Sequence, residues 1–173
     1  MSQFKEIKPE ELNDNTFKMI GKDWMLITAS KGDLVNTMTA SWGGLGVIWN
    51  RNVAYVFIRP QRYTKEFVDA SDTFSLTFYG KEYKEQLSYL GCVSGRDEDK
   101  IAKAELTVTR ELGTPYFEEA KIVLICKKLF AQPLEESSFL QPGLAEKFYP
   151  EKDYHTMYVA EIVKVLVDES CQN

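Results

Sequence analysis

Short apolar runs, separated by turn-forming and charged segments, dominate the hydrophobic pattern of the chain. Where apolar residues follow one another without a break, the pattern is typical of a strand buried on both faces. Phe74, Leu76 and Phe78 alternate with small polar residues, which predicts a strand with one buried face. The segments that predict strands are residues 24–29, 37–42, 53–58, 74–78, 121–130 and 157–167.

Three segments between these strands favour helices. Tyr63, Phe67 and Ala70 share one helical face, and residues 83–90 have the same spacing before Gly91, which predicts the helix end there. Residues 94–97 are typical of a helix start that leads into the polar segment 98–103. Since helices and strands do not alternate, the pattern favours a mostly antiparallel barrel of the α+β class over a parallel sheet.

Two local features qualify this pattern. Glycines at positions 43, 44 and 46 are expected to interrupt the strand that ends at Trp42. Glu161 and Lys164 fall on opposite faces of the last predicted strand, so strict alternation fails and a β-bulge is expected there.

Length and composition restrict the function classes. The 173 residues predict one domain, 1–173, and the net charge of −5 disfavours nucleic-acid binding. A single histidine and three cysteines without a CxxC pair predict no metal site and a reducing compartment. The polar first residues are not typical of a signal peptide, and no run approaches the ~20 apolar residues of a membrane helix. We therefore expect a soluble cytoplasmic protein with no membrane contact.

Neither a dinucleotide fingerprint nor a P-loop is present, because Trp49 replaces the third glycine of a GxGxxG pattern and no GxxxxGK occurs. The densest cationic stretch, residues 59–65, contains Arg59, Arg62 and Lys65 and no acid. It joins a strand end to a helix start, where backbone N–H groups, the Thr64 hydroxyl and guanidinium groups could bind phosphate. The alternative is a solvated turn with an ordinary helix cap.

Residues 36–46 are the second candidate, because small polar residues flank Trp42 and nearby glycines allow a ligand to approach the backbone. The alternative is a barrel strand with a packed tryptophan. His155 precedes the last strand and could transfer or stabilise a proton near neutrality, or be a structural loop residue. Lys100 could be a second phosphate contact or part of a charged helix face, and Cys92 has no assigned role.

Four segments, taken in order, resemble the flavin reductase-like, FMN-binding split-barrel family. They are NTMTASWGGLGVIW (36–49), YVFIRPQRYTKEF (55–67), VSGRDEDK (93–100) and HTMYVAEIVKV (155–165). The resemblance spans about residues 20–168. It implies a six-stranded antiparallel split β-barrel with peripheral helices, a homodimer, and FMN held near the subunit interface.

The resemblance also implies roles for individual residues. His155 matches a residue near the flavin and is the only candidate for a catalytic side chain. The expected FMN-binding residues are Asn36, Thr37, Met38, Thr39, Ala40, Ser41, Trp42, Arg59, Arg62, Tyr63, Thr64, Ser94, Lys100 and His155. Within this set, residues 36–42 would line the isoalloxazine ring, largely through their backbone, and the turn at 59–64 would bind the phosphate.

Two functional classes remain open in that family. An NAD(P)H-dependent flavin reductase would take a hydride from NADH or NADPH, and its nicotinamide site has no motif that locates it. A flavoredoxin-like electron carrier would keep its FMN and exchange electrons with a redox protein. A split barrel that binds haem or pyridoxal phosphate is a third interpretation, which the single histidine disfavours for haem.

Overall fold

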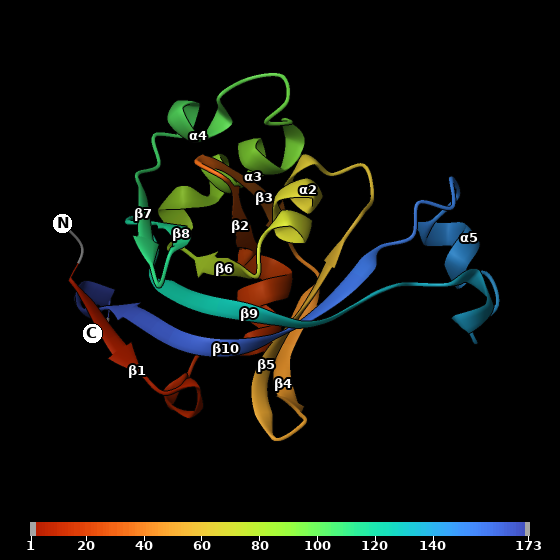
Figure 1. Ribbon diagram of the computed structural model, residues 1–173, viewed down its shortest axis with the longest axis horizontal. Coiled ribbons are helices and arrows are strands. Elements are labelled where there is room, and N and C mark those ends of the chain that lie inside the picture. Colours follow the sequence, from red (N-terminus) through yellow and green to blue (C-terminus); the bar gives the residue numbers. More distant parts are fainter. Residues whose placement is uncertain (1–2, 172–173) are drawn as a thin grey trace.

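The computed structural model describes residues 3–171. Long antiparallel strands form most of it, and helices lie around the edge of the sheet (Figure 1). The strands are β1 (Phe4–Ile7), β2 (Met25–Lys31), β3 (Leu34–Ala40), β4 (Gly43–Ile48), β5 (Arg51–Ile58), β6 (Thr73–Phe78), β7 (Val108–Glu111), β8 (Thr114–Phe117), β9 (Ile122–Pro133) and β10 (Thr156–Asp168).

The helices are short and belong to the connections between strands. The α-helices are α1 (Thr16–Lys18), α2 (Tyr63–Ala70), α3 (Lys84–Cys92), α4 (Lys100–Lys103) and α5 (Leu144–Phe148), and α1 runs into a π-helical turn, η2 (Met19–Asp23). The remaining turns are the 3₁₀ segments Pro9–Glu11, Lys81–Tyr83, Glu136–Ser138 and Glu169–Cys171. No helix among residues 3–171 is long and apolar enough to cross a membrane.

The main sheet has eight strands in the described part of the chain, in the order β3-β2-β6-β9-β10-β5-β4, with β1 paired to β10. Every pairing is antiparallel, so the predicted fold class is confirmed. The predicted number of six strands is too low. In the main sheet the missed strands are β1, whose residues carry no apolar pattern, and β4. The separate two-stranded sheet of β7 and β8 was also missed.

β4 is a strand and not an interruption, which corrects the expectation drawn from its glycines. Gly43 pairs with Val56 of β5, and a Cβ atom at position 43 would lie 2.6 Å from the Tyr55 carbonyl oxygen. Glycine therefore lets β4 approach β5 closely enough to pair. The expected bulge in β10 is present, because the register with β9 shifts between Ile162 and Lys164.

Two hydrophobic cores explain why several strands are apolar at every position. Ile27 of β2 and Leu124 of β9 point into the inner core, and Leu26 and Ile125 point into an outer core beneath α3 and the β7–β8 hairpin. The alternation in β6 does not leave a solvated face as predicted. Ser75 is buried and donates a hydrogen bond to the Pro115 carbonyl oxygen of β8 at 2.6 Å.

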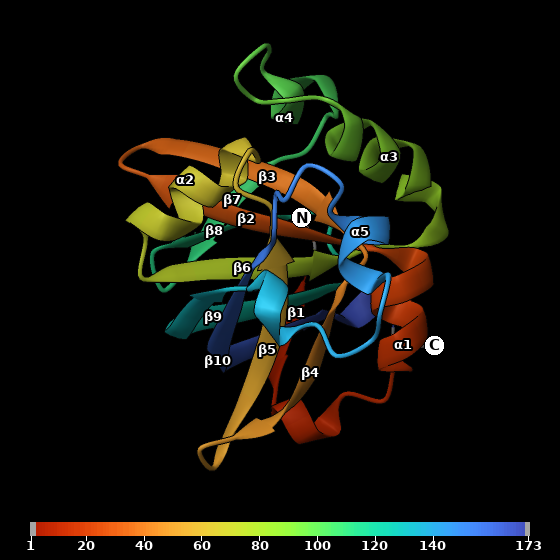
Figure 2. The same ribbon diagram turned by 90° about the vertical axis from the view of Figure 1, so that its right-hand side faces the viewer.

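The connection between β9 and β10, residues 134–155, carries α5 and extends away from the sheet at the right of Figure 1. We call this segment the arm. Figure 2, turned by 90°, shows α2, α3 and α4 gathered along the upper side of the sheet and α5 in front of it. The end of β5, the start of α2 and the arm therefore enclose one region of the surface.

Candidate functional site

Two adjoining cavities occupy the region between β3, the end of β5 and the arm. The first has a volume of about 230 Å³ and is lined by Met38, Thr39, Ala40, Ser41, Trp42, Phe57, Arg59, Arg62 and His155. The second, of about 340 Å³, is lined by Asn36, Met38, Arg59, Gln61, Arg62, Tyr63, Thr64, Cys92, Val93, Ser94, Gly95, Lys100 and Asp153. We call them the ring cavity and the cation cavity. Because both include Met38, Arg59 and Arg62, they meet at these side chains.

All but one of the residues predicted from the sequence line at least one of these cavities. The exception is Thr37, which is fully buried where β3 pairs with β2. Its hydroxyl donates to the Ile27 carbonyl oxygen at 3.1 Å and lies 2.9 Å from the Thr28 hydroxyl, so Thr37 holds β3 against β2. Any part that Thr37 plays in binding is limited to its backbone.

The ring cavity has an aromatic wall. The Trp42 ring lies 5.3 Å from the His155 ring and 5.6 Å from the Phe148 ring of the arm, and Phe57 packs edge-on against His155 at 6.5 Å. Trp42 lines the cavity and remains 45% exposed, so part of its surface is available to a ligand. Phe57 is a lining residue that the sequence reasoning missed, because it lies within an unbroken apolar run.

The cation cavity is built around the start of α2. Thr64 is buried, and its hydroxyl accepts a hydrogen bond from Asn36 Nδ2 at 2.9 Å. Arg62 occupies the N-cap position without a side-chain cap, so Thr64 lies inside the helix and is not its cap. The backbone N–H groups of Tyr63 and Thr64, at the start of this helix, and the Arg62 guanidinium give the cavity the donors that an anion needs.

Lys100 lies beneath the loop that follows α3. Its Nζ donates to the carbonyl oxygens of Leu90 and Val93, each at 2.9 Å, and thereby caps the end of α3. Burial, with the positive charge of Arg62, lowers the pKa of Lys100 to about 8. Gly95, in the same loop, packs closely against the Asn36 side chain, since a Cβ atom at position 95 would lie 2.2 Å from Asn36 Oδ1.

Arg59 is engaged by the arm. Its Nη1 donates to Asp153 Oδ2 at 2.5 Å, its Nη2 donates to the Phe148 carbonyl oxygen at 2.9 Å, and the guanidinium lies 4.9 Å from the centre of the Tyr149 ring. By contrast, within residues 3–171 the Arg62 guanidinium makes one hydrogen bond, to the Gly91 carbonyl oxygen at 3.2 Å. Of the two arginines, Arg62 is therefore the better placed to bind a ligand.

Lys65, the third cation of the predicted phosphate turn, faces away from both cavities. It pairs with Asp69 at 2.7 Å and lies over the Tyr158 ring. Cys92 lines the cation cavity at its exposed rim. Asp153 and Gln61 were missed by sequence reasoning, because they come together only through the contact between the arm and the turn after β5, where Gln61 Nε2 donates to Asp153 Oδ2 at 2.7 Å.

His155 is buried, with 8% of its surface exposed, and its Nδ1 lies 2.7 Å from the Tyr149 hydroxyl. Burial, followed by the positive charge of Arg59, lowers its pKa to about 4, so the imidazole is neutral at pH 7. This differs from the expectation of a histidine that titrates near neutrality. Its packing against Trp42, Phe57 and Tyr149 removes it from water and accounts for the difference.

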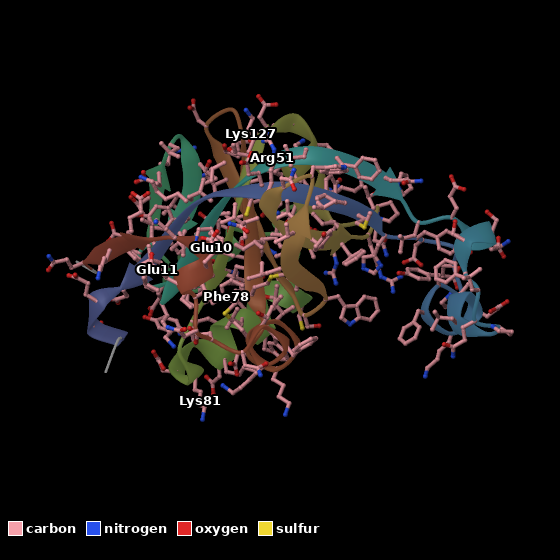
Figure 3. The ribbon with its side chains drawn as sticks, turned by 90° about the horizontal axis from the view of Figure 1, so that it is seen from below. Glu10, Glu11, Arg51, Phe78, Lys81 and Lys127 are labelled. Carbon is pink, nitrogen blue, oxygen red and sulfur yellow. The ribbon has the colours of Figure 1, made fainter. Side chains whose placement is uncertain are left out.

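A further cavity of about 460 Å³ lies between η2, the start of α3 and β9, and five of its twelve lining residues are lysines. Asp14 pairs with Lys121 and Asp23 with Lys18, which balances part of this charge. Figure 3 shows Lys81 at the outer edge of the molecule, where it points into solvent. No residue that the sequence predicted for the site lines this cavity.

A family model described as "Flavin reductase like domain" matches residues 18–173. No curated protein matches the chain. Among solved structures, an FMN-binding domain of a flavin reductases-like enzyme from Shewanella baltica OS155 is 15% identical, with a TM-score of 0.72 over 99% of this chain and 81% of that one. Flavoredoxin of Desulfovibrio vulgaris (Miyazaki F) is 24% identical, with a TM-score of 0.67 over 87% and 72%.

The flavin reductase of styrene monooxygenase from Pseudomonas putida S12 is 14% identical, with a TM-score of 0.63 over 86% of this chain and 80% of that one. At these identities the similarity to solved structures establishes the fold. It confirms the predicted split-barrel class, to which the sheet order and the peripheral helices conform.

Proposed function

The chain belongs to the flavin reductase-like domain family, and on that basis we propose that its two adjoining cavities bind one molecule of FMN. The observation that supports this most strongly is their chemical difference. One cavity has an aromatic wall and the other is cationic, and they meet at Arg59 and Arg62. Together they fall within the roughly 300–1,000 Å³ that is typical of small-molecule sites.

The residues of the chain fit the two ends of this ligand. Trp42 and residues 38–41 of the ring cavity would contact the planar ring, and Arg62, Lys100 and the first turn of α2 would bind the phosphate. Thr64 and Asn36 hold each other in place at the floor of the cation cavity. Arg59 would act at the junction, where it fixes the arm beside the ring cavity.

We further propose that the protein is an NAD(P)H-dependent flavin oxidoreductase. Bound flavin would supply the group that accepts a hydride from NADH or NADPH. The buried wall of Phe57, Trp42 and His155 would exclude water from one side of the ring cavity and orient the ligand there. As a neutral imidazole, His155 would contribute a hydrogen bond and not a full positive charge.

A flavoredoxin-like electron carrier is the second candidate. The observation in its favour is that Trp42 leaves almost half of its surface exposed at the mouth of the ring cavity, where a redox protein could approach. The two functions differ in the source of electrons and in the affinity for flavin. Experiments can measure both directly.

We also propose that two copies of the chain associate. Val47 of β4, Trp49 of the turn between β4 and β5, and Phe130 of β9 are exposed, with the rings of Trp49 and Phe130 6.1 Å apart. Burying such a surface against a second copy would stabilise a symmetric dimer. Light scattering should return twice the mass of one chain, and a single-chain mass at all concentrations would contradict this proposal.

The test of the proposed function has two steps. In the first step, the purified protein is titrated with FMN while flavin fluorescence is recorded, and the titration should show saturable binding to one site per chain. In the second step, the complex is mixed with NADH or NADPH in a stopped-flow instrument. Reduction should bleach the flavin absorbance at least as fast as the enzyme turns over in the steady state. Binding without bleaching by either nucleotide would favour the carrier, and no binding of FMN would overturn the proposal.

A further inference from the structure

A short contact in the arm joins Tyr149 to His155. Tyr149 directly follows α5, and its hydroxyl oxygen lies 2.7 Å from His155 Nδ1. Both side chains are buried, with Tyr149 6% and His155 8% exposed. Arg59 holds Tyr149 in place, because its guanidinium lies against the Tyr149 ring and donates a hydrogen bond to the carbonyl oxygen of Phe148, the preceding residue.

The direction of this hydrogen bond follows from the other hydrogen-bond partners that are available to the Tyr149 hydroxyl. Within residues 3–171 the Tyr149 hydroxyl has no other hydrogen-bond partner. If His155 Nδ1 carried the proton and donated it, the buried phenolic proton of Tyr149 would be left without an acceptor, which is costly. We therefore take the phenol as the donor and Nδ1 as the acceptor.

The charge of the imidazole agrees with this direction. The groups that face His155 are Arg59, Arg62, Asp153 and Tyr149, and burial together with the two arginines outweighs the attraction of the carboxylate. His155 therefore has a low pKa, of about 4, and burial raises the pKa of Tyr149, so the phenol keeps its proton. A neutral imidazole carries one N–H group, which must then be on Nε2.

The other ring nitrogen, Nε2, is not enclosed by the protein. His155 lines the ring cavity with Trp42 and Phe57. In the described part of the chain Nε2 makes no hydrogen bond, and it is not among the buried polar atoms that lack a partner, so it keeps some accessible surface. An N–H group on Nε2 is thus available to a molecule bound there.

We propose that Tyr149 is a positioning residue, which fixes His155 as a neutral imidazole that presents its Nε2–H group to the ring cavity. The state of His155 is a property of the free protein. Its use rests on the proposed function, where a fixed neutral donor would bind a carbonyl oxygen or an acceptor nitrogen of a planar ligand. Such a donor would not change its charge between pH 5 and 8.

NMR spectroscopy of the ¹⁵N-labelled, untagged protein without flavin tests this proposal, because the chain has a single histidine and its imidazole signals are unambiguous. Long-range ¹H–¹⁵N correlation should show an unprotonated Nδ1 and a protonated Nε2, with no titration between pH 5 and 8. A wild-type spectrum with the proton on Nδ1, or with a midpoint near 6.5, would overturn the proposal without any variant.

The variant Tyr149→Phe should change the ratio of the two tautomers by roughly twofold to tenfold, which corresponds to one ordinary hydrogen bond, and should raise the midpoint of titration. Tyr154→Phe is the matched control. Its ring lies 5.0 Å from the Tyr149 ring in the same arm, but its hydroxyl interacts with Glu136. Equal effects of the two variants would contradict a specific role for Tyr149.

This experiment does not depend on the proposed function. If FMN fails to bind but the tautomer is as expected, the proposed function is wrong and the role of Tyr149 stands. If FMN binds and the wild-type tautomer is the opposite one, the role of Tyr149 is wrong and the proposed function stands.

Discussion

Acidification should destabilise the protein through His155, because the folded protein resists protonation of this side chain. Its pKa falls from 6.5 to about 4 on folding, chiefly through burial. Between these values the unfolded chain binds a proton that the folded chain does not, so the free energy of unfolding rises with pH across this window. A depression of this size corresponds to about 3 kcal/mol once the pH lies below both values.

The variant His155→Gln isolates this contribution. Carboxylates such as Asp153, whose hydrogen bonds with Gln61 and Arg59 lower its pKa, also weaken the fold in acid, but they do so in both proteins. Urea unfolding at several pH values should therefore show that the wild type loses about 2 kcal/mol more than the variant between pH 7 and 4.5. Equal losses would refute the claim that His155 is held neutral by its surroundings.

Further predictions concern the cation cavity. Arg62→Gln should weaken FMN binding by roughly tenfold, as expected for one lost charge-assisted bond, and leave riboflavin binding nearly unchanged, as measured by paired fluorescence titrations. Arg59→Met should weaken the binding of FMN and of riboflavin by the same factor, because the Arg59 guanidinium binds the arm. A selective loss of FMN binding would instead assign Arg59 to the phosphate. Gly95→Ala should lower the melting temperature and FMN affinity, because the added Cβ atom would displace Asn36 from Thr64; unchanged values would contradict the close packing of this loop.

Elements with a strong local pattern could be predicted from the sequence. The helix predicted for residues 63–70 has those bounds in the structure, since Phe67 and Val68 are buried and Arg62 precedes the first turn. β4 could not be predicted, because its glycines are explained only by the approach of Tyr55 from the neighbouring strand. The second buried face of β6 depends on β8, some 40 residues further along the chain.

The same limit applies to the candidate site. The sequence singled out residues 38–42, the turn at 59–64 and His155 by their residue types and order, and the structure brings them together at the two cavities. Asp153 and Tyr149 were not singled out, because their importance lies in contacts with Arg59 and His155 that depend on the tertiary structure of the arm. The neutral state of His155 likewise depends on burial, which no local sequence pattern indicates.

The central claim is that one FMN molecule spans both cavities, and a crystal structure of the protein grown with FMN tests it most directly. We expect the flavin ring beside Trp42 and His155 and the phosphate within hydrogen-bonding distance of Arg62 and the backbone N–H groups that begin α2. Flavin bound in the lysine-lined cavity between η2 and α3, or with its phosphate directed toward Trp42, would contradict the claim.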